Sequence, residues 1–325
     1  MKIGIVGTGS ISSLFVKSAN KIKDFNCLSI YGRSEDKTIA FKEEFCLAKH
    51  FTDYDEFLSD EEMNCVYIGL PNSLHYEYAV KAAKKNKHII IEKPFVSNLR
   101  EFDSLIEICK QNDVKIVEVN RVLPLPNYDV VKENVTKCGN ISIVSGTYFQ
   151  YSRKYDALVN GETPNVFTSE YSGGALMDLG VYSVHLIVGL FGLPVASHYS
   201  AKKKEDSVDL AGVLTLEYKD FIVVLMQSKV SFGNNQFMIQ GDKASIVAAA
   251  IPSRLEKIDL QTKNEKVDIS VLQHQDNFYY ALSDIQKCFL EKAHYENRLK
   301  QSRNVLSVLD EARRSAGIIF SADKQ

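Results

Sequence analysis

A lysine at the end of an apolar run is the first residue of this sequence that could do chemistry. The run His88-Ile89-Ile90-Ile91 predicts a buried parallel strand, and Glu92-Lys93-Pro94 follows it directly. Open α/β sheets bind their ligands beyond the ends of such strands, so Lys93 is expected at a ligand crevice. Partial burial lowers the pKa of a lysine, which would let Lys93 donate a proton near neutral pH. The alternative is an ordinary Glu-Lys pair on the surface.

A second group of reactive side chains lies in the segment from Gly173-Gly174 to His185. On a helix, Asp178 and Tyr182 are four residues apart and Tyr182 and His185 are three apart, so all three share one face. An acid, a phenol and an imidazole on an otherwise apolar helix could together transfer protons. Singly, each has a structural alternative: Asp178 as a local cap, Tyr182 with its hydroxyl in water, and His185 as a satisfied core histidine.

The N-terminus predicts a dinucleotide-binding turn. An apolar strand at residues 3–6 is followed at once by Gly7-Thr8-Gly9-Ser10-Ile11-Ser12 and a helical pattern. Gly7 permits the tight turn, and Gly9 lets backbone N–H groups approach a pyrophosphate. Ser12 replaces the third glycine, where the helix must pack on the strand. A glycine pair after a strand can also be merely a turn.

The end of the second strand, at residues 28–31, indicates the coenzyme. An acidic residue there would bind the ribose hydroxyls of NAD, but the chain has Gly32-Arg33-Ser34. A guanidinium without a carboxylate suits a 2′-phosphate, so we expect NADP, with NAD as the alternative. In that alternative Arg33 is a solvated loop residue, and Glu35 and Asp36 only begin the next helix.

Further cofactor contacts are expected where other strands end. Leu70-Pro71-Asn72 closes the strand at residues 65–70, so Asn72 and His75 could contact the cofactor, although His75 could equally lie on the surface at a helix start. The full set of expected contacts is Gly7, Thr8, Gly9, Ser10, Ile11, Ser12, Arg33, Ser34, Leu70, Pro71, Asn72, His75, Glu92, Lys93, Pro94 and Arg121. Substrate contacts are expected from Arg121, from the loop at residues 152–171 and from the sheet of the second half.

Strands and helices alternate through the first 120 residues, which predicts an α/β domain with a doubly wound parallel sheet. Two helix starts carry capping-box spacing, Asp53 with Glu56 and Asn98 with Glu101. The alternation stops at the two prolines of residues 120–126. We therefore expect a dinucleotide-binding domain at residues 1–122 and a second domain at residues 123–325.

The second half is β-rich and predicts an α+β domain with an open, mainly antiparallel sheet. Its strands are expected at residues 141–151, 195–201, 210–218, 221–227 and 236–240. Late helices carry apolar stripes, and the last of them could pack back on the first domain. The run Phe221–Met226 is apolar at successive positions, so both faces of its strand require cover. We expect a homodimer or a dimer of dimers through this sheet, the alternative being cover by the chain itself.

Composition excludes several classes of protein. The 39 basic and 41 acidic residues are interspersed and the formal net charge is −2, so neither nucleic acid nor an anionic membrane is an expected partner. The six cysteines form no Cys-x-x-Cys pair, which predicts reduced thiols and neither a metal site nor a disulfide framework. With no leader or membrane span expected, we predict a cytoplasmic protein.

Taken together, the glycine loop, the Glu92-Lys93-Pro94 run and the segment from Gly173-Gly174 to Tyr182 resemble the Gfo/Idh/MocA oxidoreductase family. The resemblance implies hydride transfer between a nicotinamide and a carbinol or carbonyl. It also implies that Lys93 is the catalytic lysine, Asp178 an acid that orients the substrate, and Tyr182 the acid/base, with His185 as a second candidate. Inositol-type members carry histidine at the position of Tyr182. A tyrosine resembles the glucose–fructose oxidoreductase and dihydrodiol dehydrogenase branch, which generally prefers NADP.

Two functions follow from these observations. The first is an NAD(P)-dependent dehydrogenase or reductase acting on a sugar, polyol, dihydrodiol or related small substrate. A free tyrosine, with a pKa of about 10, is a poor base at neutral pH, but a nearby cation favours phenolate, and Lys93 is expected to supply it. The alternative is a sensor of the same fold that binds dinucleotide or sugar without turnover.

Overall fold

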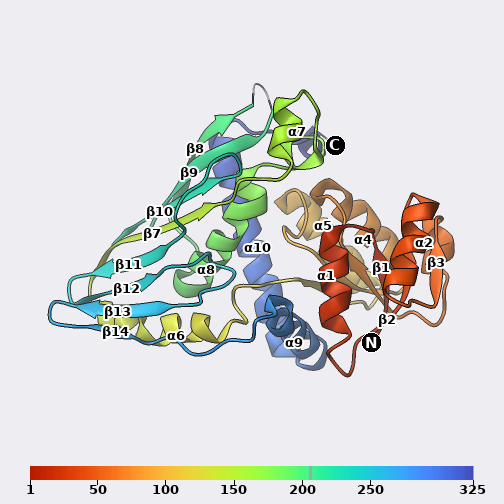
Figure 1. The fold of residues 1–325 in the computed structure, drawn as a ribbon, viewed down its shortest axis with the longest axis horizontal. Helices are drawn as coiled ribbons and strands as arrows, with labels where there is room; N and C mark the ends of the chain where they lie inside the picture. Colours follow the sequence, from red (N-terminus) through yellow and green to blue (C-terminus); the bar gives the residue numbers. More distant parts are fainter. Residues whose placement is uncertain (205–206, 325) are drawn as a thin grey trace. The chain divides into compact units, whose positions relative to one another are not determined.

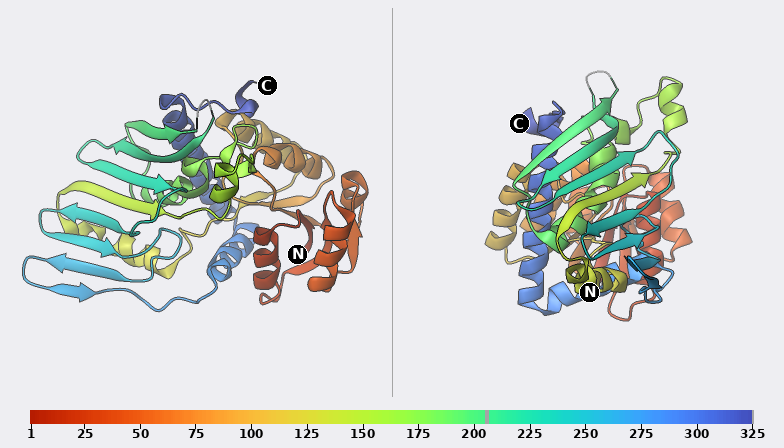
Figure 2. Two further views of the ribbon diagram at one scale, coloured as in Figure 1. Left: turned by 45° about the horizontal axis from the view of Figure 1, so that its top comes forward. Right: turned by 90° about the vertical axis from the view of Figure 1, so that its left-hand side faces the viewer.

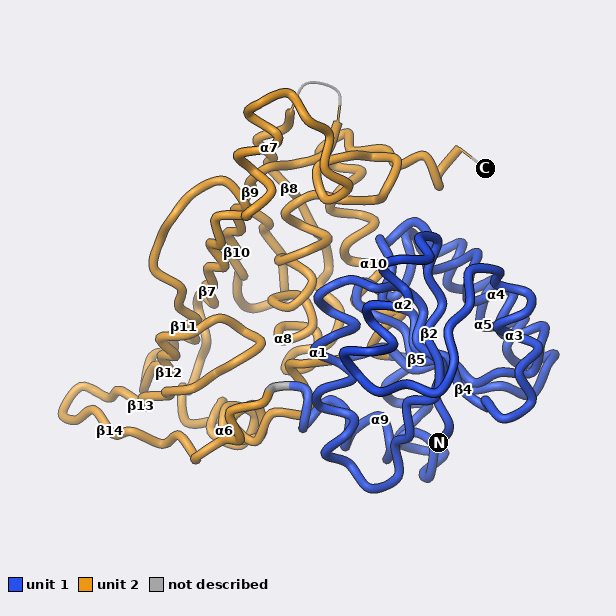
Figure 3. Tube along the Cα trace, turned by 45° about the vertical axis from the view of Figure 1, so that its right-hand side comes forward, with its two compact units in different colours: residues 1–119, 278–300 blue, residues 120–277, 301–325 orange. Residues whose placement is uncertain are grey.

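The computed structural model describes residues 1–204 and 207–324, apart from the side chain of Asn277. These residues form two compact units, coloured separately in Figure 3: unit 1 comprises Met1–Val119 and Phe278–Lys300, and unit 2 comprises Asn120–Asn277 and Gln301–Gln325. The expected domain boundary after residue 122 stays a prediction. Among the described residues, no helix has the length and apolar character that a bilayer crossing requires.

Unit 1 contains a six-stranded parallel sheet in the order β3-β2-β1-β4-β5-β6 (Figure 1). This is the strand order of a doubly wound dinucleotide-binding sheet, as predicted. Its strands are β1 (Lys2–Val6), β2 (Asn26–Tyr31), β3 (Lys49–Phe51), β4 (Cys65–Ile68), β5 (His88–Ile91) and β6 (Ile116–Glu118). Strands β1 and β4 are neighbours although β2 and β3 intervene in sequence, so the chain reverses direction across the sheet there. Ligands bind at such a reversal point.

Two helices of unit 1 begin at the capping residues that the sequence predicted. Both predicted caps form: Asp53 accepts a hydrogen bond from the Glu56 N–H at 2.9 Å, and Asn98 accepts one from the Glu101 N–H at 2.9 Å. The helices are α1 (Ser10–Ala19), α2 (Glu35–Glu44), α3 (Tyr54–Leu58), the 3-10 turn η1 (Asn72–Leu74), α4 (His75–Lys84), α5 (Leu99–Gln111), α9 (Asn277–Leu290) and the first part of α10 (Lys292–Ser315).

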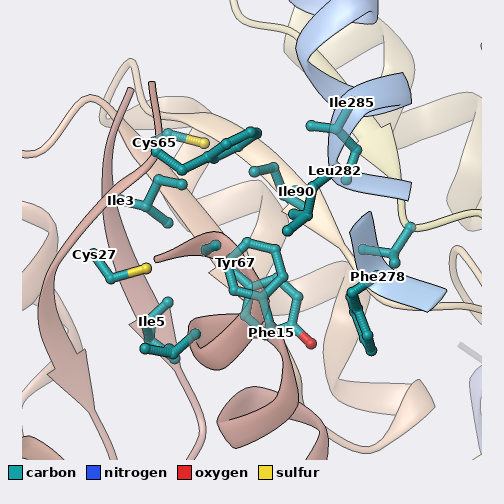
Figure 4. Close-up of a cluster of buried hydrophobic side chains, with 14 of the residues drawn as sticks. Ile3, Ile5, Phe15, Cys27, Cys65, Tyr67, Ile90, Phe278, Leu282 and Ile285 are labelled. Carbon is teal, nitrogen blue, oxygen red and sulfur yellow. The ribbon is translucent and has the colours of Figure 1, made fainter. Parts of the chain in front are cut away.

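A continuous apolar core fixes α1 against the sheet of unit 1 (Figure 4). The Phe15 ring of α1 stacks on Tyr67 of β4 with centroids 3.7 Å apart, and Phe278 of α9 meets Phe15 edge-on at 6.5 Å. Leu282 and Ile285 of α9 belong to the same core. The chain therefore returns to unit 1 after completing most of unit 2, and α9 covers part of the first sheet.

Unit 2 contains an eight-stranded sheet in the order β14-β13-β12-β11-β7-β10-β9-β8. All neighbours are antiparallel except β7 and β10, so the predicted mainly antiparallel sheet is confirmed. Its strands are β7 (Ile141–Phe149), β8 (Ala196–Lys203), β9 (Asp209–Glu217), β10 (Ile222–Ser228), β11 (Phe237–Gly241), β12 (Ala244–Ala248), β13 (Ile258–Thr262) and β14 (Lys266–Asp268). Strands β12 to β14 were not predicted.

Helices of unit 2 lie on one face of this sheet (Figure 2). The end of α10 is joined to β8 by a hydrogen bond from the Tyr199 N–H to the Ser315 hydroxyl at 2.9 Å. The other helical segments are α6 (Pro126–Asn134), η2 (Val135–Cys138), α7 (Tyr155–Val159), η3 (Asn165–Phe167), the π-helical turn η4 (Leu176–Gly180), α8 (Val181–Phe191) and η5 (Ser321–Lys324). Along β10, Val223 and Leu225 are buried while Ile222 is 48% exposed, so only one face of this strand is fully covered within the chain.

An enclosed ion network holds the C-terminal segment on α10. The guanidinium of Arg313 contacts Asp310 at 2.7 Å and Asp323 at 2.5 Å, and it lies over the Phe320 ring at 4.5 Å. Because the Arg313 side chain is only 1% exposed, both carboxylates compensate a charge that water does not reach.

Candidate active site

Lys93 is the second residue after the end of β5, as the sequence predicted. It is half-buried, and its peptide bond to Pro94 is cis. Its backbone N–H donates to the Glu92 carboxylate at 3.2 Å, and the Tyr67 hydroxyl donates to the same buried carboxylate at 3.0 Å. Since the Tyr67 ring is stacked on α1, Glu92 ties the Lys93 turn to the glycine-loop helix. This arrangement makes Glu92 a residue that positions Lys93.

His75 has partners of its own within unit 1. The imidazole is fully buried, with Nδ1 at 3.0 Å from the Pro94 carbonyl oxygen and Nε2 at 2.9 Å from the Leu70 carbonyl oxygen. Burial lowers the pKa of His75, so the ring is neutral at pH 7 and donates to one of the two carbonyls. His75 therefore links the turns that follow β4 and β5. Asn72 lies beside it in η1 and is half-buried.

The glycine loop fits the pyrophosphate of a dinucleotide. Gly7 has φ +103°, and a Cβ there would lie 3.0 Å from the Gly69 carbonyl oxygen. A Cβ on Gly9 would meet nothing within 4 Å, so its backbone faces open space where α1 begins. The first turn of α1 has no acidic residue, and the first N–H groups of a helix attract anions. Thr8, Ser10, Ile11 and the buried Ser12 complete the turn.

Arg33 and Ser34 lie on the surface between β2 and α2. Ser34 is the N-cap residue of α2, and its carbonyl oxygen accepts from the Thr38 hydroxyl at 2.7 Å. The first helical turn contains Glu35 and Asp36. Arg33 is thus exposed at the strand end where the ribose was expected, next to two carboxylates that only begin the helix.

In unit 2, a glycine pair and a buried carboxylate shape the turn that carries Asp178. Gly174 has φ +110°, and a Cβ there would come within 2.1 Å of the Asp209 carboxylate, so only glycine fits. Asp209 accepts from the Leu176 N–H at 2.7 Å and from the Tyr199 hydroxyl at 2.5 Å. It thereby anchors the start of η4, and π-helical turns of this kind occur often at functional sites.

Asp178 lies in η4 and pairs with a lysine that the sequence did not single out. The Lys229 ammonium contacts the Asp178 carboxylate oxygen Oδ2. Lys229 comes directly after β10, and its side chain is 5% exposed, while that of Asp178 is 32% exposed. The pair therefore joins the end of β10 to the π-helical turn.

Tyr182 lies in the first turn of α8 with its hydroxyl against a cation. The Arg121 guanidinium donates to the Tyr182 hydroxyl, and its carbon lies 5.1 Å from the centre of the ring. The Tyr148 ring of β7 packs at 5.9 Å on the same residue, which is 4% exposed. A cation beside a phenol favours the phenolate form. Within unit 2 this cation is Arg121; the field expected from Lys93 stays a prediction.

His185 is buried one turn beyond Tyr182 and contacts the neighbour of Arg121 along the chain. The Asn120 side-chain amide lies 2.9 Å from His185 Nδ1, and Asn120 Oδ1 accepts from the Val122 N–H at 2.9 Å. Because the amide nitrogen can only donate, His185 Nδ1 is the acceptor of this hydrogen bond. Asn120 and Arg121 thus hold His185 and Tyr182, respectively.

One further cluster has the residue types of a metal site. Asp284, Cys288 and His294 bring potential ligand atoms within 4.8 Å of one another in unit 1. The Asp284 carboxylate is already bound by the Arg298 guanidinium, at 2.7 to 3.0 Å. Burial raises the pKa of Cys288 to about 12, which keeps the thiol protonated. Asp284 and Arg298 form an ion pair, and His294 Nε2 lies 2.8 Å from the same carboxylate.

Two partners of the candidate site residues were not predicted from the sequence: Lys229, which pairs with Asp178, and Asn120, which contacts His185. A signal for Lys229 was present, because the alternation of buried Val223, Leu225 and Gln227 along β10 continues to position 229 on the covered face. A lysine on that face requires a partner of opposite charge. No comparable signal existed for Asn120, whose role depends on α8 lying beside it.

Two family descriptions match the chain in order. "Oxidoreductase family, NAD-binding Rossmann fold" matches residues 1–120, and "GFO/IDH/MocA C-terminal domain" matches residues 134–247. The chain belongs to the GFO/IDH/MocA oxidoreductase family. This confirms the resemblance drawn from the glycine loop, the Glu92-Lys93-Pro94 run and the segment that ends at Tyr182. The dinucleotide-binding domain and the oxidoreductase class follow from it.

Relatives in this family extend over the whole chain. An NADP(+)-dependent scyllo-inositol 2-dehydrogenase of Bacillus subtilis (strain 168), IolU, is 32% identical, with 100% of this chain and 99% of the relative covered. A trans-1,2-dihydrobenzene-1,2-diol dehydrogenase of Danio rerio is 22% identical over 100% of this chain and 99% of its own. Both are named as dehydrogenases, and neither supports the alternative of a sensor without turnover.

Solved structures share the fold. KijD10, a 3-ketoreductase from Actinomadura kijaniata in complex with NADP and TDP-benzene, superposes with a TM-score of 0.86 at 17% identity, covering 98% of this chain and 99% of its own. An oxidoreductase from Agrobacterium radiobacter in complex with NAD+, L-tartaric acid and magnesium gives a TM-score of 0.78 at 13% identity, with 98% and 96% covered.

Proposed function

We propose that this protein is an NADP-dependent dehydrogenase of cyclic polyols or sugars. The observation that carries the proposal is the charge arrangement on η4 and α8, where Tyr182 faces the Arg121 guanidinium and Asp178 faces the Lys229 ammonium. An acid/base phenol and a substrate-orienting carboxylate are what oxidation of one hydroxyl among several requires.

In the proposed reaction, Tyr182 removes the hydroxyl proton of the substrate carbon that is oxidised. The bound nicotinamide would supply the hydride acceptor. Arg121 stabilises the phenolate that accepts the proton, because its guanidinium already donates to the Tyr182 oxygen. Lys93 is proposed as a second residue of this proton chemistry, as the family resemblance implies, and Glu92 holds the Lys93 turn in place. Asp178 accepts a hydrogen bond from a neighbouring substrate hydroxyl.

His185 is proposed to position α8 rather than to exchange protons with substrate. Its Nδ1 is engaged by Asn120, and the residue is buried. Tyr182→Phe should therefore lower turnover while His185→Ala leaves the acid/base chemistry in place. If Tyr182→Phe kept full activity and His185→Ala did not, the acid/base would be His185, one helical turn further along.

NADP is proposed as the coenzyme, with NAD as the weaker ligand. Arg33 is exposed at the end of β2, where a 2′-phosphate would lie, and no carboxylate occupies the position that usually binds the ribose hydroxyls. The similar scyllo-inositol dehydrogenase of B. subtilis is NADP(+)-dependent by name. The remaining contacts are proposed from the glycine loop, from Leu70-Pro71-Asn72 and from the Lys93 turn.

A cyclic polyol is proposed as the substrate because similarity is higher to the scyllo-inositol enzyme, at 32%, than to the dihydrodiol enzyme, at 22%. The tyrosine at position 182 had argued against an inositol-type assignment. The proposal gives the overall similarity to the scyllo-inositol enzyme more weight than the residue at position 182.

The test is steady-state reduction of NADP+ and NAD+ with inositol isomers, hexoses, pentoses and trans-dihydrodiols. We expect saturable activity with at least one cyclic polyol or sugar, and a higher kcat/KM with NADP+. Activity with dihydrodiols alone would overturn the substrate proposal. Bound cofactor with no oxidation of any member of the panel would overturn the enzymatic one.

We also propose a cytoplasmic homodimer, or a dimer of dimers, formed through the sheet of unit 2. On the uncovered face, Ile222 of β10 lies opposite Ile143 of β7, and Met226 lies opposite Val213 of β9. Ile143, Val213 and Ile222 are each more than a third exposed, and an apolar sheet face of this kind marks an interface. All six cysteines are free thiols, which suits a reducing compartment. Light scattering should give a dimer or tetramer, and Ile222→Lys should give a monomer; a monomeric parent would contradict the proposal.

A further inference from the structure

Lys229 is a buried lysine that is paired with a carboxylate. Its ammonium contacts Asp178, and its side chain is 5% exposed. Its backbone is held independently, because its N–H donates to the Leu210 carbonyl oxygen at 2.9 Å and its own carbonyl oxygen accepts from the Ser152 N–H at 2.8 Å. Main-chain bonds to both neighbouring segments therefore fix this part of the chain without the side chain.

Asp178 is held differently from Lys229. It lies in the π-helical turn η4, and its N–H donates to the Gly174 carbonyl oxygen at 3.1 Å. The Asp178 side chain is 32% exposed, and its oxygen Oδ2 contacts the Lys229 ammonium. A carboxylate has about four acceptor positions on its two oxygens, so the ion pair leaves capacity for further hydrogen bonds.

We propose that Lys229 is a positioning residue for the substrate, acting through Asp178. The ammonium fixes the rotamer of the Asp178 carboxylate and directs its exposed oxygen toward a substrate hydroxyl next to the carbon that is oxidised. The inference rests on the proposed polyol dehydrogenase function and adds a residue that the functional motifs do not contain. It identifies the substrate class more closely, as one with vicinal hydroxyl groups.

A misplaced Asp178 carboxylate would lower the rate of oxidation, because it could not accept the hydrogen bond that orients the substrate. A short carboxylate that is free to rotate samples several χ1 wells, and only one of them places an oxygen against the substrate. A misplacement of about 1 Å can lower the rate about 10²-fold. A fixed cation from the rigid end of β10 removes this freedom, as supporting residues do for ligands at functional sites.

The test is a double-mutant cycle built from Lys229→Met, Asp178→Asn and the double variant. The readouts are kcat/KM with the preferred polyol and the dissociation constant of that polyol from the enzyme–NADPH complex. The second readout stays measurable when turnover is too slow. NADPH affinity and the thermal midpoint report whether each variant is folded. Lys219→Met is the matched control, since Lys219 is an exposed lysine in the turn before β10.

We expect Lys229→Met to lower kcat/KM about 10²-fold and to weaken polyol binding, with NADPH affinity within about threefold of the parent. In the Asp178→Asn background the same substitution should change both readouts less than about threefold, because the two residues act as a unit. Lys229→Arg, which keeps the charge, should recover part of the loss, and Lys219→Met should match the parent.

Equal losses from Lys229→Met in both backgrounds would overturn the proposal, because Lys229 would then act on the fold and not through Asp178. An unchanged kcat/KM in Lys229→Met would overturn it as well. If Lys229→Met does not fold, Lys229→Arg takes its place in the cycle: a partial loss in the parent that disappears in the Asp178→Asn background would support the proposal. An equal loss in both backgrounds, or full activity in Asp178→Asn, would refute it. A parent enzyme inactive toward every polyol would instead refute the proposed function.

Discussion

Removing the charge of Arg121 should shift the pH dependence of oxidation. The Arg121 guanidinium carbon lies 5.1 Å from the centre of the Tyr182 ring, and the group donates to the hydroxyl. Two unit charges at that separation attract by about 3 kcal/mol at an effective dielectric constant of about 20. This energy corresponds to a shift of about 2 pH units in the acid limb of kcat/KM. Because Arg121 is only half-buried, solvent screening reduces the expected shift to about 1 to 2 units.

The sign follows from which form of Tyr182 reacts. Oxidation requires the phenolate, and the cation favours it, so Arg121→Met should move the acid limb of kcat/KM toward higher pH by about 1 to 2 units. At neutral pH, kcat/KM should fall about 10 to 100-fold. The activity in the alkaline plateau should fall far less.

The assay is a pH profile of NADP+ reduction for the parent, Arg121→Met, Arg121→Lys and Tyr182→Phe, with NADP+ affinity measured for each. Arg121→Lys keeps the positive charge, so its acid limb should lie close to that of the parent, although the planar guanidinium group is lost. An acid limb unmoved in Arg121→Met, with activity lowered equally at all pH values, would refute the reasoning and assign Arg121 to binding alone.

Three other predictions follow. Arg33→Ala should weaken NADPH binding by about 1 to 3 kcal/mol and leave NADH nearly unchanged by fluorescence titration; equal effects on both would remove the basis for the coenzyme preference. The pKa of His75 is lowered by burial, so below about pH 6.5 the unfolded chain binds a proton that the native chain does not, and stability should fall as pH falls. Urea unfolding should show a smaller pH slope in His75→Gln, and an identical slope would contradict this. Arg313→Met should cost about 3 to 5 kcal/mol of unfolding free energy, whereas the exposed Arg314→Met should cost less than about 1; similar values for both would show that the buried network contributes little.

Much of unit 1 could be predicted because its signals are local. The caps at Asp53 and Asn98 follow from residue type and spacing, and a glycine turn after an N-terminal strand specifies a strand–turn–helix. The apolar run of β5 placed Lys93 at a strand end. The predicted caps and strands depended on no distant residue, and the structure confirms them.

Unit 2 was less predictable because its elements depend on distant partners. Strand β12, Ala244–Ala248, is short, and β14 is exposed and polar, so neither shows an apolar alternation of useful length. The expectation of one face for Asp178, Tyr182 and His185 used α-helical spacing, but the π-helical turn η4 interrupts it. Their partners Lys229, Arg121 and Asn120 come from other segments, which only the folded chain brings to α8.

Lys93 and Tyr182 are proposed to perform the proton chemistry of a polyol oxidation in which a bound nicotinamide accepts the hydride. The most direct measurement is the rate of NADPH formation from a saturating cyclic polyol for the parent, Lys93→Ala and Tyr182→Phe, with NADP+ affinity measured in parallel. We expect turnover by the parent, about 10² to 10⁴-fold lower turnover in each variant, and NADP+ affinities within a few-fold of one another. Parental turnover in both variants, with cofactor bound equally well, would contradict it.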